Sequence, residues 1–174
     1  MKKALIVSAL CICALFVVVP GQAKAADTFR VGIEAAVPIP LLDWGDATGV
    51  GFGAFGKFEF YFNPNMGLSA RFGYIYHLNK TVLGVDAHST EMPILIGFKY
   101  LTDFGLYGEL ATGICRYEVV AGGFSGDEWK LGLLLGVGYE IFGLNAGVNL
   151  FWPSAGDIDD IMALMFTIGW SFGF

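Results

Sequence analysis

Large apolar residues and small residues alternate strictly at the end of this chain. Phe166, Ile168, Trp170, Phe172 and Phe174 are separated by Thr167, Gly169, Ser171 and Gly173. Because successive side chains of a β-strand point to opposite faces, the segment predicts a strand with one continuous apolar face and one face of small groups. Lipid on one side and a narrow interior on the other would suit such a strand.

The same alternation recurs along the chain and predicts eight strands. They cover residues 29–37, 50–62, 66–76, 91–100, 106–114, 128–141, 144–152 and 166–174. A soluble, lipocalin-like barrel would place the apolar residues inside. However, the interior of an eight-stranded barrel is only just filled by side chains, so these many large groups must face outward. Closure leaves no unpaired edge in hydrocarbon, and the prediction is an all-β, antiparallel, up-and-down transmembrane barrel.

The links between these strands support the same architecture, because short and long links alternate. Short turns are expected at 63–65, 102–103 and 142–143, and longer links at 38–47, 77–89, 118–127 and 153–160. Both chain ends then lie at the short-turn end, as in an up-and-down barrel.

Charged residues recur on the face that the alternation directs inward. They are Arg30, Glu34, Lys57, Glu59, Arg71, Glu91, Lys99, Glu109, Glu128, Lys130 and Glu140. An unpaired charge is costly to bury, whereas paired charges are tolerated. The sequence therefore predicts either a plug of ion pairs or, alternatively, a thin ion path that opens when a pair rearranges. The individual pairs depend on barrel shear, which the sequence does not reveal.

The start of the chain has the features of a secretory signal. Lys2 and Lys3 precede an apolar run over 4–19, and residues 23–25 form an A-x-A cleavage site. We expect a signal peptide at 1–25 and a mature barrel domain at 26–174; an uncleaved anchor is the alternative. Removing the signal takes three of the ten basic residues and none of the 16 acidic ones, leaving a net charge of −9. This acidity argues against nucleic acid as a partner.

The terminal strand, which ends on Phe174, resembles the C-terminal targeting strand of bacterial outer-membrane barrels. The whole mature pattern resembles the small barrel families typified by the OmpA transmembrane domain and OmpX. The resemblance implies a monomer in the outer membrane, surrounded by lipid and lipopolysaccharide, and an assembly signal in Phe166, Ile168, Trp170, Phe172 and Phe174 that the barrel-assembly machinery reads. It implies no cofactor. One departure is that the expected loops are too short for the long protruding sheet of OmpX, which makes adhesion through a strand edge less expected.

Two further groups of residues suggest other chemistry. Asp157, Asp159 and Asp160 are spaced closely enough to suggest Ca²⁺ or Mg²⁺, although a solvated acidic rim is the favoured explanation and no metal site is predicted. Residues 88–91 contain His88, Ser89 and Glu91, which are the residue types that a lipid A-modifying site at the rim would need. His88 and Glu91 nevertheless point to opposite faces of a strand, and His77 across the link is expected at the membrane interface.

The function expected from the sequence is therefore non-enzymatic. It is a structural, envelope-integrity or surface-interaction role with a largely plugged lumen. A narrow pore for ions or very small solutes is the first alternative, and a lipid A-modifying enzyme is the second.

Overall fold

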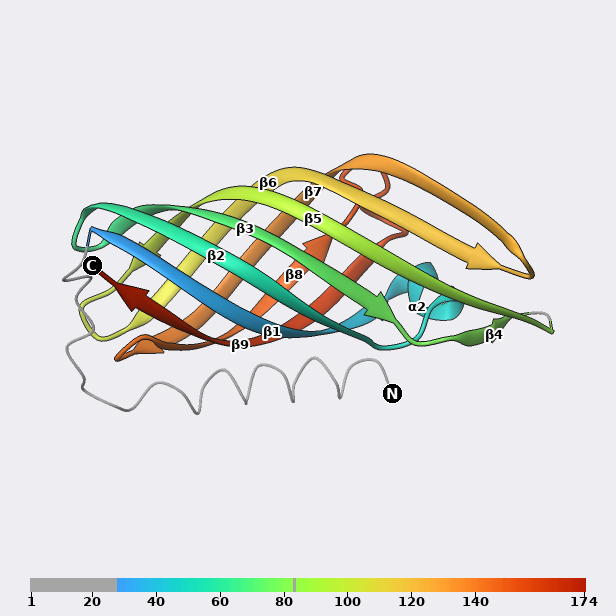
Figure 1. Ribbon diagram of the computed structural model, residues 1–174, viewed down its shortest axis with the longest axis horizontal. Coiled ribbons are helices and arrows are strands. Elements are labelled where there is room, and N and C mark those ends of the chain that lie inside the picture. The colour runs from blue at the N-terminus through green and yellow to red at the C-terminus, as the bar shows by residue number, and fades with distance from the viewer. Residues whose placement is uncertain (1–27, 83) are drawn as a thin grey trace.

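Eight long antiparallel strands wind around one axis and close on themselves in the computed structural model, which describes residues 28–82 and 84–174 (Figure 1). The first and last barrel strands pair from Arg30–Gly173 to Leu41–Met162, which closes the barrel. The predicted fold class is confirmed; the expected signal peptide lies outside the described residues. The barrel strands are β1 (Phe29–Leu41), β2 (Gly51–Asn63), β3 (Met66–His77), β5 (Val85–Leu101), β6 (Leu106–Ala121), β7 (Phe124–Ile141), β8 (Leu144–Trp152) and β9 (Met162–Gly173).

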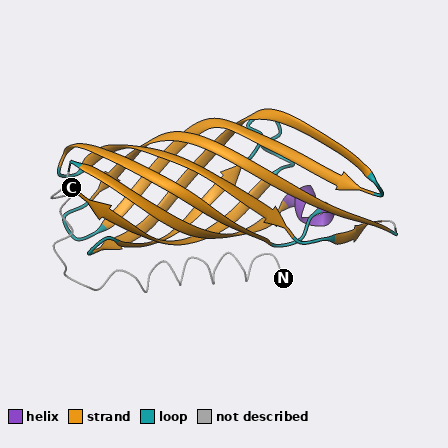
Figure 2. Ribbon diagram, in the orientation of Figure 1, coloured by secondary structure: helices purple, strands orange, loops and turns teal. Residues whose placement is uncertain are grey.

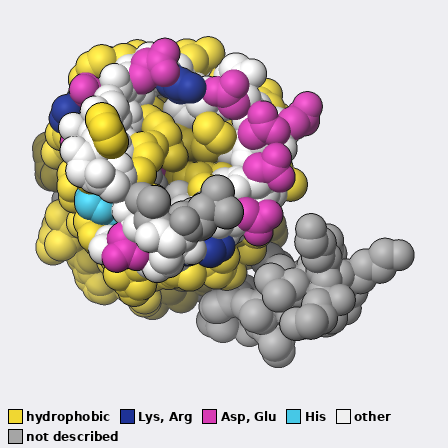
Figure 3. All heavy atoms as spheres, turned by 90° about the vertical axis from the view of Figure 1, so that its right-hand side faces the viewer, with side chains coloured by type: hydrophobic (Ala, Val, Ile, Leu, Met, Phe, Trp, Pro, Cys, Tyr) yellow, Lys and Arg dark blue, Asp and Glu magenta, His cyan; other side chains and the backbone are white. Residues whose placement is uncertain are grey.

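The two faces of each strand differ as the alternation predicts. Ile33 and Phe72 are 72% and 65% exposed on the outward wall, whereas their neighbours Glu34 and Arg71 are almost fully buried inside. Large apolar side chains thus cover the outside of the barrel, as the end-on view also shows (Figure 3). The charged side chains next to them in sequence turn inward.

The first long link contains a short helix, α2 (Leu42–Ala47), at the long-link end of the barrel (Figure 2). Strand β1 continues to Leu41 rather than ending at Val37. It pairs with β2 only as far as Ala36 but follows β9 to Leu41. A strand with one free edge accommodates Pro38 and Pro40, which lack an N–H group. No helix in the described part of the chain is long and apolar enough to cross a membrane.

Two other long links are largely strand, which corrects the sequence prediction. Strands β6 and β7 stay paired up to Ala121–Phe124, around a turn where Gly122 and Gly123 have positive φ angles. The short strand β4 (Lys80–Val82) pairs with the start of β5. The result is a sheet that projects beyond the barrel (Figure 1). Outside the membrane both faces meet water, so the sequence there shows no alternation. The expectation that the loops are too short for a protruding sheet is wrong.

Candidate functional site

Eight charged side chains form one unbroken chain of ion pairs across the lumen. Among its pairs, Lys99 Nζ lies 2.5 Å from Glu140 Oε2, and Lys57 Nζ lies 3.9 Å from Glu34 Oε2. Cations and anions alternate throughout, so the chain is electrically neutral. Its order is Arg30, Glu140, Lys99, Glu59, Lys57, Glu34, Arg71 and Glu109.

The strand register explains why one carboxylate links two cations of this chain. Lys57 on β2 lies directly opposite Arg71 on β3, and like charges across a strand pair repel. Glu34, on the neighbouring strand β1, forms ion pairs with both of them. Glu34 thereby offsets the repulsion between Lys57 and Arg71.

Two tyrosines pack against the cations at the short-turn end of the lumen. The guanidinium of Arg30 lies 5.1 Å from the centre of the Tyr61 ring, and Lys99 Nζ lies 4.5 Å from that of Tyr107. Tyr61, Leu101 and Tyr107 form a buried cluster there. Cation–π contacts of this kind stabilise desolvated ammonium and guanidinium groups.

An apolar layer fills the lumen on the other side of the ion-pair chain. These apolar residues lie nearer the long-link end of the barrel than the charged residues do. On β2, for example, Phe55 precedes Lys57, and on β5 Leu95 precedes Lys99. Alternation places these residues inward, yet the sequence prediction assumed a polar lining and missed them. The layer consists of Ala36, Phe55, Ile75, Leu95, Ala111, Cys115, Leu134, Phe151 and Met165.

A histidine–carboxylate pair follows beyond the apolar layer. His77 Nε2 lies 2.9 Å from Glu91 Oε1, and His77 Nδ1 lies 2.9 Å from the carbonyl oxygen of Gly49. Glu91 therefore pairs with His77 rather than with a lysine or arginine. The prediction that His77 lies at the membrane interface is wrong, because its side chain is fully buried.

The helix α2 packs over this pair. Trp44 is buried, with its ring centre 4.9 Å from that of His77 and 6.1 Å from that of Tyr117. The backbone N–H of Trp44 donates to the carbonyl of Asp160 at 3.1 Å, and Lys80 Nζ donates to the carbonyl of Gly45. The helix is thus fastened to two other links.

Glu128 and Lys130, expected in the lumen, lie at its outer end instead. The Glu128 side chain is 70% exposed. Lys130 Nζ lies 3.0 Å from Asp157 Oδ2, and the Ser154 hydroxyl donates to the same oxygen at 2.7 Å. Both interactions hold the pKa of Asp157 below its usual value, and the hydrogen bond from Ser154 has the larger effect. The strands have already left the barrel at Glu128, which is why alternation misplaces it.

The acidic rim and the serine–histidine stretch do not form the sites suggested above. Acidic side chains gather around the mouth (Figure 3), but the described residues contain no group of three or more His, Cys, Asp or Glu placed to hold a metal ion. Ser89 is buried, whereas His88 lies with its ring 5.5 Å from that of Tyr76. The structure brings His77, not His88, to Glu91.

The barrel with its filled lumen matches a known family over almost the whole chain. The family is described as "Outer membrane protein beta-barrel domain", and the match covers residues 11–174. The chain belongs to this family. Its location is the outer membrane. A comparison with curated proteins found no match.

Solved outer-membrane barrels share the fold of this outer membrane protein at low identity. Neisserial surface protein A has a TM-score of 0.58 and 18% identity, over 84% of this chain and 97% of that one. Ail of Yersinia pestis has a TM-score of 0.55 and 17% identity, over 83% and 97%. The N-terminal barrel domain of OprF from Pseudomonas aeruginosa has a TM-score of 0.50 and 14% identity, over 82% and 97%. These likenesses establish the fold alone.

In this outer membrane barrel the apolar residues of the terminal strand face the lipid. Ile168 and Phe172 are 57% and 65% exposed on the outer wall. Phe174 ends the chain beside the start of β1, where its N–H donates to the carbonyl of Phe29 at 3.0 Å. The last strand is thus joined to the first at the short-turn end.

Proposed function

We propose that this protein is a non-conducting structural barrel of the outer membrane that presents a protruding sheet at the cell surface. The observation that carries the first part is the stacking of different layers in one lumen. A neutral ion-pair chain, an apolar layer and a capped His77–Glu91 pair follow one another along the axis.

The ion-pair chain resists conduction because its charges are all engaged. Lys99 touches two carboxylates, Glu59 and Glu140, and Arg71 touches Glu34 and Glu109. A permeating ion would have to displace one of these partners. Separating a buried pair leaves an uncompensated charge in a low-dielectric interior, which is strongly unfavourable.

The apolar layer adds a second barrier of a different kind. Leu95, Leu134 and Phe151 have 1% or less of their surface exposed. Hydrophobic constrictions block ions by excluding water. Rearranging the charged layer alone would therefore leave the lumen closed.

A narrow pore is the second candidate, and a polar strip on β8 and β9 favours it. Asn145, Asn149 and Thr167 line the lumen there and are buried. Within the described residues, the Asn145 side-chain amide has no hydrogen-bond partner. Such a strip would suit a thread of water beside the ion-pair chain, although Phe151 and Met165 end it.

The protruding sheet supports the surface-contact part of the proposal. β8 pairs with β7 only from Leu133 onward, so the described chain offers no strand partner on that side of residues 124–132. Phe124 at its tip is 85% exposed. Unpaired strand edges can add another strand. Ail, which shares the fold, is named as an attachment and invasion protein.

The remaining parts of the proposal concern export, assembly and turnover. A signal peptide at 1–25 would direct export, and the aromatic terminal strand would serve as the assembly signal. Lipopolysaccharide would surround a monomeric barrel, because closure by β1 and β9 leaves no barrel edge for a second copy. We expect no catalytic turnover, since Glu91 pairs with His77 rather than with His88 of the suggested rim site.

The test of the lumen is solute efflux from vesicles that contain the refolded mature protein. A plugged barrel should release chloride and a small sugar at the same rate as protein-free vesicles. Efflux that falls with solute size would instead favour the narrow pore. Folding is checked by circular dichroism and by protection of the barrel from trypsin.

A further inference from the structure

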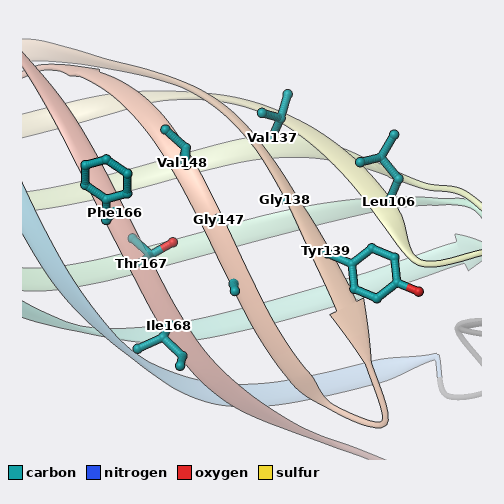
Figure 4. A pocket seen from close by; sticks show the side chains of 10 residues that line it. Leu106, Val137, Gly138, Tyr139, Gly147, Val148, Phe166, Thr167 and Ile168 are labelled. Atoms are coloured by element: carbon teal, nitrogen blue, oxygen red, sulfur yellow. The ribbon is translucent and has the colours of Figure 1, made fainter. Parts of the chain in front are cut away.

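An apolar groove of about 320 Å³ lies in the membrane-facing wall, away from the lumen. It lies where β6, β7, β8 and β9 run toward the short turns (Figure 4). Its rim is formed by Leu106, Val137, Tyr139, Val148, Phe166 and Ile168.

A single small side chain creates the depth of this groove. Leu106, Tyr139, Ala146 and Ile168 form one row across four strands, because each is paired with the next. Three of these side chains are large and Ala146 is not. The wall is therefore lowest at Ala146, between two bulky neighbours.

Inward-facing residues form the rest of the floor, because each of them presents only its backbone to the outside. A Cβ atom on Gly147 would lie 2.4 Å from the Tyr107 hydroxyl oxygen, and one on Gly138 would lie 2.5 Å from it. Tyr107 presses against this part of the wall from inside. The two glycines are thus required by packing in the lumen, and the wall at this point is thin.

A second hollow lies on the other side of Ile168. A neighbouring hollow shares Ile168 and is lined by Ala35, Ala54 and Trp170, among others. Ala35 is paired with both Ile168 and Ala54. The Ile168 side chain stands between the two hollows, so the groove around Ala146 is a depression of its own.

We propose that this depression holds one acyl chain of a phospholipid. The groove opens on the wall of the barrel that faces the membrane, so lipid is the molecule in contact with it. Apolar surface gains no hydrophobic driving force against lipid tails, so binding depends on dispersion contacts. A flexible chain lying in a groove makes contacts on several sides, whereas a flat wall offers one. The groove lies toward the short turns, which we expect to face the phospholipid leaflet.

The test uses the full mature protein in vesicles of phosphatidylethanolamine and phosphatidylglycerol that carry a photoactivatable diazirine in the middle of one acyl chain. Labelled residues are mapped by mass spectrometry. Label should concentrate on segments 137–148 and 166–168. Ala146→Leu fills the groove and should reduce that label about threefold, because the groove contacts are lost.

A matched substitution distinguishes the groove from the wall in general. Ala70 faces outward on β3 between Phe58 and Ile96, and Ala70→Leu should leave the groove label unchanged. If Ala146→Leu does not fold, Ala146→Val provides a smaller filling and a smaller decrease. Label spread evenly over the wall, or unchanged by either substitution at Ala146, would overturn the proposal. A groove protected from label within a cross-linked dimer would overturn it in favour of a second copy.

Discussion

Arg71 grips Glu109 with two N–H groups inside the lumen: Nε donates to Oε1 at 3.0 Å and Nη2 donates to Oε2. The third side of the guanidinium reaches Glu34, and the Ser69 hydroxyl donates to Glu109 Oε1 at 2.7 Å. Bidentate pairs fix geometry as well as charge. Arg71 therefore ties together two carboxylates from strands on different sides of the barrel.

Arg71→Met should destabilise the barrel by about 3–5 kcal/mol, because removing one partner leaves buried charge uncompensated. Urea unfolding in phospholipid vesicles measures the change. Arg71→Met combined with Glu109→Gln should recover part of the loss. Lys80→Met, which removes a cation outside the lumen, provides the control; an equal loss there would contradict a special role for Arg71.

Gly147→Ala should cost about 1–3 kcal/mol, the usual range for overpacking, because its Cβ atom would lie 2.4 Å from the Tyr107 hydroxyl oxygen. Tyr107→Phe removes that oxygen, so the same substitution should cost less in the Tyr107→Phe background. Gly138→Ala is the matched control, since its Cβ atom would also lie 2.4 Å from the backbone oxygen of Ala146. A double-mutant cycle without coupling at Gly147 would show that Tyr107 is not the obstacle.

The proton positions on His77 follow from its partners. A carbonyl oxygen only accepts, so His77 Nδ1 must carry the hydrogen that Gly49 receives. The contact between Nε2 and Glu91 then needs one further proton, held by either group. Nitrogen chemical shifts of the ring should show a protonated Nδ1 in the wild type and in Glu91→Gln. A ring protonated at Nε2 alone would refute this arrangement.

The contacts of Asp157 with Ser154 and Lys130, which hold the last long link in place, should depend on pH. The Ser154 hydroxyl and Lys130 hold the pKa of Asp157 below its unfolded value, which is about 3.9. Its contribution to stability is thus present above that pH and is lost as the pH falls through the folded pKa. A carbon NMR titration of the Asp157 carboxyl should show a higher midpoint in Ser154→Ala and in Lys130→Met. An unchanged midpoint in both would contradict these contacts.

Much of the barrel follows from alternation, but its interior does not. Phe166 and Ile168 are readable as one outward face because small residues separate them. Leu134 lies between two other leucines, where alternation gives no contrast, and it was missed as a lumen residue. Phe55 and Phe151 were missed for a different reason, since a polar lining was assumed.

Pairing inside the lumen depends on distances that the sequence does not contain. Glu91 and His77 belong to strands whose register sets their contact, and no local pattern announces it. The helix α2 was unexpected because 38–47 contains Pro38, Pro40 and Gly45, which favour loops. The lengths of β6 and β7 were underestimated because water surrounds both faces of their outer ends.

The most direct test of the closed lumen is single-channel recording from the refolded mature protein in a planar bilayer. The layered arrangement predicts silence from the wild type and from Lys99→Met, because the apolar layer still seals the lumen. Phe151→Ser combined with Lys99→Met, which breaches both layers, is the variant expected to show current. Discrete, salt-dependent steps from the wild type that change in Lys99→Met would contradict the plugged barrel and establish an ion path.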